Sequence, residues 1–135
     1  PGVLLENNNQ QFICKNVFLK AENNASRINA TIPTGQILKI PIAHGEGRFY
    51  ADDVTLKGII DNNQVIFSYC DEHGVVTDAA NPNGSMHNIA GICNANRNVF
   101  GMMPHPERAS EEILGNTDGR MIFESFLALS ASSVR

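Results

Sequence analysis

The order of secondary-structure signals along the chain constrains the fold most. Short apolar runs separated by turn-forming residues fill positions 1–103, and helical periodicity becomes clear only near the carboxyl end. The run "QFICKNVFLKAEN" at 11–23 predicts a strand or a bent hairpin. A second apolar run, "QILKIPIAH" at 36–44, ends in the glycine-flanked loop "HGEGR". This order predicts a β-rich α/β domain with a carboxy-terminal helix.

The later segments add a short helix, a hairpin and the final helix. The helix is predicted at 51–63, where an acidic start precedes apolar residues and an Asn pair closes the segment. Residues 64–85 predict a strand, a turn at His73-Gly74, a second short strand and a Pro-Asn-Gly loop. Residues 87–103 predict a hairpin, followed by the exit loop "PHPERA" and at most two helical turns in "SEEILG". The last helix, at about 119–130, is expected to bury one stripe: Met121, Ile122, Phe126 and Leu129.

Composition limits the classes of partner. A chain of 135 residues without an internal repeat or a linker predicts a single domain. The net charge is −4 and no like-signed residues cluster, so a nucleic-acid or anionic-membrane surface is not expected. No apolar run approaches the roughly 18 residues that span a bilayer. Small molecules or proteins remain as partners.

The cysteines and histidines predict neither a disulfide framework nor a metal site. The chain has an odd number of cysteines, Cys14, Cys70 and Cys93, and they lie far apart in the sequence. This pattern favours a reducing, cytoplasmic compartment. Each is predicted to be a small buried hydrophobe on a strand. The four histidines show no pair at the i, i+4 or H-x-H spacing of metal sites, so no metal is expected.

The stretch "GICNANRNVFGMMPHPERA" at 91–109 offers a cysteine, a histidine and a glutamate. His105 and Glu107 are two residues apart, and the flanking prolines stiffen the segment, so they form a plausible base and orienter. Cys93 lacks the glycine of a nucleophile elbow. If the hairpin turns near Asn96, Cys93 lies opposite about Val99 and roughly 20 Å from His105. Cys93 is therefore not expected to be the nucleophile.

Four ordered motifs resemble a known family. "PIAHGEGRF", "ANPNGS", "IAGI" and "GMMPHPERA" together are similar to the glutamine amidotransferase subunits of phosphoribosylformylglycinamidine synthase, an enzyme of de novo purine synthesis. "PHPE" alone would indicate only the wider class I amidotransferases. The resemblance extends over nearly all of the chain, and it implies a partial flavodoxin-like class I glutamine amidotransferase domain.

The resemblance also implies a Cys-His-Glu triad that releases ammonia from glutamine. His105 then corresponds to the base and Glu107 to its orienter, whereas the family's nucleophile lies in a "G-[IV]-C-N-G-F-Q" elbow that 1–135 does not contain. We therefore expect 1–135 to be the carboxy-terminal part of the domain, lacking the nucleophile-bearing part and inactive alone. His44 and Gly45 are expected near the substrate or the synthetase interface.

The implied partners are glutamine, a large synthetase subunit and a small accessory subunit. The synthetase would use ATP and Mg²⁺ to convert formylglycinamide ribonucleotide to formylglycinamidine ribonucleotide, with no cofactor bound by this chain. The main alternative is a non-catalytic assembly or regulatory module that binds the synthetase. A stand-alone hydrolase that uses Cys93 is disfavoured by the distance estimate above.

Overall fold

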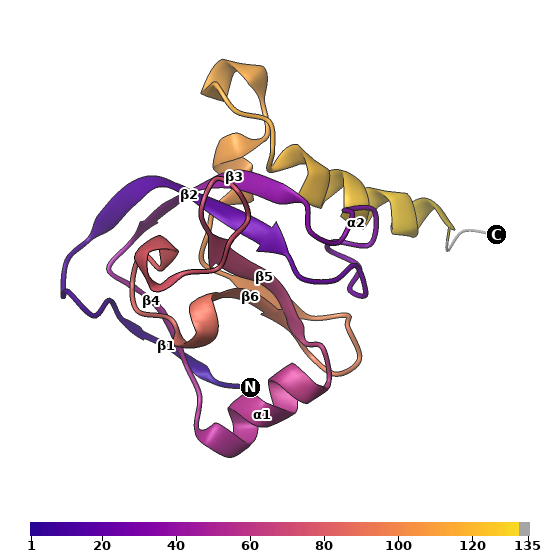
Figure 1. The fold of residues 1–135 in the computed structure, drawn as a ribbon. Coiled ribbons are helices and arrows are strands. Elements are labelled where there is room, and N and C mark those ends of the chain that lie inside the picture. Colours follow the sequence, from indigo (N-terminus) through magenta and orange to yellow (C-terminus); the bar gives the residue numbers. More distant parts are fainter. Residues whose placement is uncertain (133–135) are drawn as a thin grey trace.

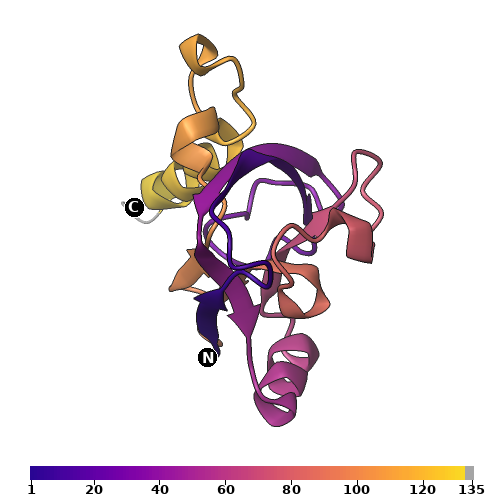
Figure 2. The same cartoon turned by 90° about the vertical axis from the view of Figure 1, so that its left-hand side faces the viewer.

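A curled antiparallel sheet forms the body of the protein in this computed structural model, which describes residues 1–132 apart from the side chains of 129–132. Its strands lie in the order β3 (Ile37–His44), β2 (Ile13–Ala21), β5 (Val65–Cys70), β6 (Ile89–Cys93) and β7 (Phe100–Met102). Figure 2 shows these strands bending around a common interior. The strands predicted at 11–23 and 36–44 and the hairpin predicted at 87–103 are thus confirmed.

The interior of the curl is the main hydrophobic core. Val17 and Leu19 on β2 pair with Ile40 and Leu38 on β3, and all four side chains are buried. Because side chains alternate across a strand, this register gives β2 and β3 one apolar face and one outer face. His44 belongs to the same face of β3 as these core residues, and it is only 5% exposed.

A two-stranded ribbon pairs β1 (Val3–Glu6) with β4 (Glu46–Tyr50). The chain passes from β3 to β4 through Gly45 alone, so most of "HGEGR" is strand and the predicted loop at that position is wrong. The pairing with β1 explains the difference. Strand β1 is distant in the sequence, so its position beside Glu46–Tyr50 has no local sequence signal.

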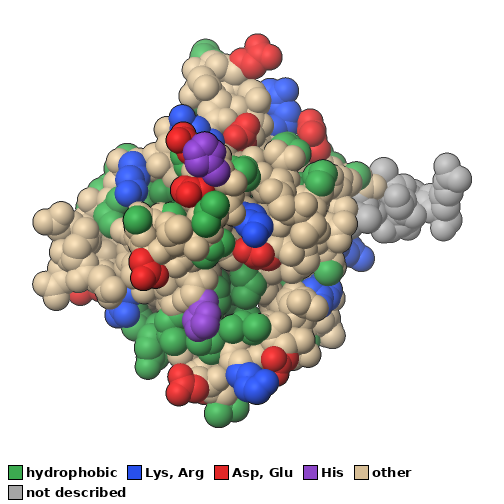
Figure 3. Space-filling view, in the orientation of Figure 1, with side chains coloured by type: hydrophobic (Ala, Val, Ile, Leu, Met, Phe, Trp, Pro, Cys, Tyr) green, Lys and Arg blue, Asp and Glu red, His purple; other side chains and the backbone are tan. Residues whose placement is uncertain are grey.

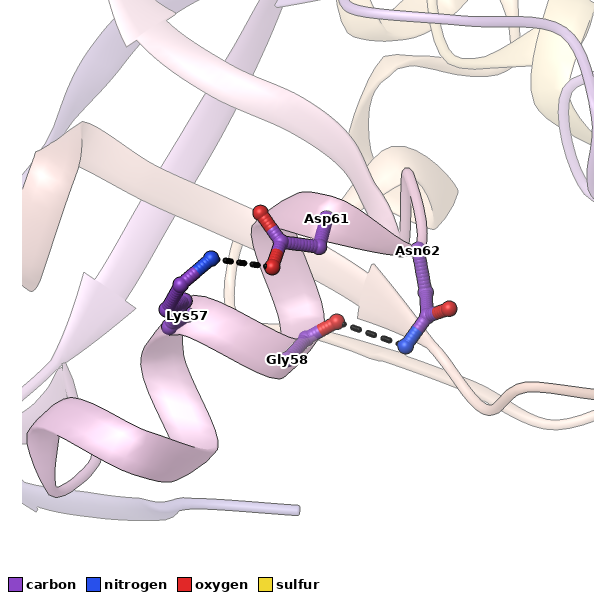
Figure 4. Close-up of polar contacts among 4 residues, drawn as sticks. All are labelled: Lys57, Gly58, Asp61 and Asn62. Carbon is purple, nitrogen blue, oxygen red and sulfur yellow. Dashed lines mark hydrogen bonds and ion pairs between the residues drawn. The ribbon is translucent and has the colours of Figure 1, made fainter.

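Helix α1 (Asp53–Asp61) covers a second, smaller core cluster. The Asp52 carboxylate caps its first turn by accepting two backbone N–H groups. Leu56 and Ile59 face inward, while Lys57 pairs with Asp61 on the outer surface (Figure 4). The helix predicted at 51–63 is confirmed.

Residues 71–88 form turns and two short 3₁₀ helices, η1 (Asp78–Ala80) and η2 (Met86–Asn88). The turn at His73-Gly74 is confirmed, and the Asp71 carboxylate accepts backbone N–H groups within it. The second short strand predicted after this turn is wrong. Asp71 and Thr77 satisfy the local backbone donors instead, which favours turns over a ladder.

The carboxy-terminal region contains η3 (Pro106–Ala109), η4 (Glu112–Leu114) and α2 (Arg120–Ser132). The expected final helix is confirmed, but its predicted stripe is only partly buried. Ile122 is fully buried, whereas Phe126 is 47% exposed because that part of α2 extends beyond the sheet (Figure 1). The side chain of Leu129 lies outside the described residues.

The surface carries charges of both signs. Figure 3 shows acidic and basic side chains interspersed over the face that it presents. Across residues 1–132 no helix has the length and apolarity needed to cross a bilayer.

Candidate functional site

His105 and Glu107 meet at the start of η3. The Nδ1 atom of His105 lies 3.2 Å from Oε1 of Glu107, while the Nε2 atom of His105 is buried and has no hydrogen-bond partner. The two side chains are 28% and 57% exposed. A carboxylate beside Nδ1 favours the neutral tautomer with its proton on Nδ1, which leaves a lone pair on Nε2, so this arrangement can accept a proton at Nε2.

The edge of the main sheet positions His105. Its backbone N–H donates to the Pro41 carbonyl on β3 at 2.8 Å. Pro106 then opens η3, with Glu107 in its first turn. The two-residue spacing of His105 and Glu107 suggested the pair, and a tight 3₁₀ turn brings the two side chains together. The turn places both side chains beside β3.

Glu107 also faces a cation. Arg108 Nε lies 3.8 Å from the same Oε1 atom that faces His105. This guanidinium is about half exposed, so solvent screens its attraction for the carboxylate. Glu107 Oε1 nonetheless lies between the His105 imidazole and the Arg108 guanidinium.

His44 is a second imidazole close to this pair. Both of its ring nitrogens are buried and have no hydrogen-bond partner. Burial lowers the pKa of His44 below its ordinary value, and the positive charge that His105 can carry lowers it further. His44 is therefore held neutral beside His105.

Backbone contacts and a glycine fix the place of the His44 ring. Asn7 donates from Nδ2 to the His44 carbonyl at 2.8 Å, and its backbone N–H donates to the Gly45 carbonyl at 2.8 Å. A Cβ atom on Gly47 would lie only 2.4 Å from the His44 ring. Glycine is thus required at position 47 by packing, because a side chain there would occupy the space of the His44 imidazole.

The cysteines lie elsewhere. Cys93 ends β6, where it pairs with Phe100 and not with the predicted Val99, and it is 2% exposed. Burial raises its pKa, and Nη1 of Arg97 lies 3.9 Å from its Sγ atom. Cys70 is also buried, and burial raises its pKa to about 11. The burial predicted for these two cysteines is confirmed.

The burial predicted for Cys14 is wrong. Cys14 lies on β2 as expected, but its side chain is exposed. It alternates with the inward-facing Val17 and Leu19 and so belongs to the outer face of the strand.

An apolar cleft of about 190 Å³ shares Gly47 with the surroundings of the His44 ring. The start of β1, strand β6 and the segment 101–103 line it. Its lining includes Gly47, beside the His44 ring, and Met103, two residues before His105, but not His44, His105 or Glu107 themselves.

Of the site residues that the sequence suggested, His105 and Glu107 are in contact and His44 and Gly45 lie nearby. Sequence reasoning missed Asn7, Pro41 and Gly47. Gly47 could have been predicted from its position close to His44 in the sequence. The contacts of Asn7 and Pro41 have no local sequence signal. Among the described residues, no group of three or more His, Cys, Asp or Glu side chains could hold a metal ion.

Comparison with known proteins assigns the chain to a family. The family model of the CobB/CobQ-like glutamine amidotransferase domain matches residues 2–123. The chain belongs to this family. The motifs that suggested an amidotransferase therefore lie in an amidotransferase domain, and the predicted resemblance is confirmed.

Individual relatives show which kind of glutamine amidotransferase this domain is similar to. The phosphoribosylformylglycinamidine synthase subunit PurQ of Methanocaldococcus jannaschii is 55% identical over 126 residues, covering 93% of this chain and 55% of the relative. The same subunit of Aquifex aeolicus is 52% identical over 128 residues, covering 95% of this chain and 56% of the relative.

A solved structure agrees with these relatives. The structure of PurLQS from Thermotoga maritima matches with a TM-score of 0.76 and 42% identity, covering 96% of this chain and 53% of that chain. The amidotransferase domain described here thus spans little more than half the length of the relatives that it matches.

Proposed function

We propose that this chain supplies the base and the orienter of a glutaminase, in the amidotransferase subunit of phosphoribosylformylglycinamidine synthase. The subunit would release ammonia from glutamine for the step that converts formylglycinamide ribonucleotide to formylglycinamidine ribonucleotide. The observation that carries the proposal is the contact of His105 Nδ1 with Glu107 at 3.2 Å, with Nε2 left without a partner. Family membership and the PurQ relatives support it.

In this proposal, His105 Nε2 takes the proton of a cysteine thiol, and the thiolate attacks the side-chain amide carbon of glutamine. The tetrahedral intermediate expels ammonia, which receives its proton from the His105 imidazolium. Water then attacks the thioester with His105 as base, releasing glutamate and the free thiol. Glu107 holds the Nδ1 proton and stabilises the imidazolium that forms at each stage.

The nucleophile is assigned to a part of the subunit that corresponds to the unmatched half of the relatives. Cys93 and Cys70 are buried with raised pKa values, which disfavours the thiolate. Cys14 is exposed, but it lies on the outer face of β2, opposite the face to which His44 belongs. Residues 1–135 are thus proposed to be the carboxy-terminal part of the domain and to lack glutaminase activity alone.

His44 and Gly45 are proposed to support the site and not to react. The ring nitrogens of His44 are buried, so His44 is proposed to be a positioning residue near His105 that does not contact the substrate. Its neutrality spares His105 a neighbouring positive charge, which would otherwise oppose protonation of the base. Gly45 joins β3 to β4 and so sets the direction in which the chain leaves His44.

The proposal also assigns the partners. Glutamine is the substrate of this subunit, and a large synthetase subunit and a small accessory subunit complete the assembly in the cytoplasm. ATP and Mg²⁺ are assigned to the synthetase, because the chemistry proposed for His105 and Glu107 requires neither.

The test uses a subunit of the relatives' full length, assembled with the synthetase. Replacing His105→Asn should reduce glutamine-dependent product formation by about 10²–10⁴-fold and leave ammonia-dependent formation unchanged. His73→Asn is the matched control, since His73 also faces a glutamate, at 3.7 Å, but on the exposed surface. Equal glutamine-dependent rates in the two variants would refute the proposal.

The same experiment separates the alternative of a non-catalytic assembly module. Such a module predicts that His105→Asn leaves both the glutamine-dependent and the ammonia-dependent rate unchanged. The contact between His105 and Glu107 favours the catalytic proposal, because binding a synthetase requires no such pair.

A further inference from the structure

The segment between the candidate site and α2 projects from the body as an arm, residues 110–118. Figures 1 and 2 both show it standing clear of the sheet. Its two sides meet at a β-bridge between Glu111 and Asn116. Gly115 ends η4 in the left-handed region, at φ 76°, which allows the chain to turn back sharply.

The base of the arm is tied to the body. Asn116 donates from Nδ2 to the Lys39 carbonyl on β3, and Lys39 donates its backbone N–H to Asp118 at 2.7 Å. Gly119 donates to the Ala109 carbonyl at 2.7 Å. A Cβ atom on Gly119 would lie 2.1 Å from a backbone oxygen of η3, so glycine is needed for this close crossing. These contacts fix the direction in which the arm points.

The tip of the arm, Glu111–Leu114, holds apolar side chains in water. Ile113 is 89% exposed and Leu114 is 51% exposed, with Glu111 and Glu112 beside them. In Figure 3, hydrophobic and acidic side chains stand at the outer end of the arm. A single exposed apolar residue is ordinary, as Val54 on α1 illustrates with 84% exposure. Two neighbouring apolar residues on a tethered projection are suited to act as an interface anchor.

We propose that the tip docks into the synthetase subunit, in an apolar socket with lysine or arginine at its rim. This inference rests on the proposed function, which supplies the synthetase as a partner. The arm continues directly from η3, so a protein seated on the tip lies next to the site that would release ammonia. The two glutamates favour a basic rim, and the charge match would accelerate encounter and favour one docking register.

Cysteine footprinting tests this docking. Ile113→Cys and Val54→Cys are made separately in a subunit of the relatives' full length, and alkylation by iodoacetamide is followed by mass spectrometry at each position. Ile113→Cys should react fast in the subunit alone and at least about tenfold slower after the synthetase binds, because a docked anchor excludes solvent. Helix α1, which carries Val54, lies at the opposite end of the molecule from the arm (Figure 1), so Val54→Cys should react equally fast in both samples.

Three results would overturn the inference. Protection of Ile113→Cys in the subunit alone would mean that the same chain covers the tip. Protection by the accessory subunit alone would assign the tip to that partner. Unchanged reactivity in the complete assembly would mean that the tip remains in solvent.

Binding measurements separate this inference from the proposed function. Ile113→Asp should weaken the affinity for the synthetase about tenfold or more, and Val54→Asp should not change it. Raising the ionic strength should slow association of the wild-type subunit. His105→Asn should bind as the wild type does, so loss of glutaminase and loss of docking are independent outcomes.

Discussion

Gly47→Ala is the perturbation whose effect can be worked most fully from the geometry. The added Cβ atom would lie 2.4 Å from two atoms of the His44 ring and 2.8 Å from a third. Ordinary contacts between carbon atoms are about 3.5–4.0 Å, so the ring must retreat by about 1 Å. Because His44 is only 5% exposed and lies on the core face of β3, the ring has little free space into which it can move.

Overpacking of this kind costs about 1–3 kcal/mol in the free energy of unfolding. Urea denaturation followed by circular dichroism measures it. Gly45→Ala is the matched control, since nothing lies within 4 Å of a Cβ atom there and the residue does not have a positive φ. We expect the control to stay within about 0.5 kcal/mol of the wild type.

A double mutant identifies the cause. If the clash with the ring is responsible, Gly47→Ala should cost much less in a His44→Ala background, with a coupling of about 0.5–3 kcal/mol between the two positions. Equal stability of Gly47→Ala and Gly45→Ala would refute the reasoning, and so would a zero coupling.

Two further predictions concern two buried titratable groups, Cys93 and His44. Cys93→Ala should cost about 1 kcal/mol of stability and leave the glutaminase rate of a full-length subunit unchanged; loss of the rate with unchanged stability would instead make Cys93 the nucleophile. The lowered pKa of His44 means that, below its ordinary value of 6.5, the unfolded chain binds a proton that the folded chain does not. Stability should therefore fall as the pH drops from 6.5, by at most about 1.36 kcal/mol per pH unit from this group. Urea titrations should show the slope reduced in His44→Gln and retained in His73→Gln.

The elements with local signals were predictable from the sequence. Helix α1 has its Asp52 cap and its apolar Leu56 and Ile59 within one short stretch, so its prediction depends on no distant contact. Strand alternation also predicts the faces to which His44 and Cys14 belong. Counting from Ile40 in steps of two places His44 on the core face, and counting from Val17 places Cys14 on the outer face.

The remaining features depend on contacts between distant segments. His105 is held by the Pro41 carbonyl, and the base of the arm is held by Lys39 and Asp118, residues 79 positions apart. Nothing in the spacing of these residues indicates that β3 lies beside the exit loop. The pair of His105 and Glu107 was suggested by spacing, but the 3₁₀ turn that brings the two side chains together required the structure.

The protonation of His105 tests the central claim most directly. Nitrogen-15 NMR distinguishes the two neutral tautomers of an imidazole, and it can be applied to this chain and to its Glu107→Gln variant. If Glu107 orients a base, neutral His105 should carry its proton on Nδ1 and leave Nε2 unprotonated, and the variant should lose that preference. A neutral His105 protonated at Nε2, or a tautomer unaffected by Glu107→Gln, would contradict the account.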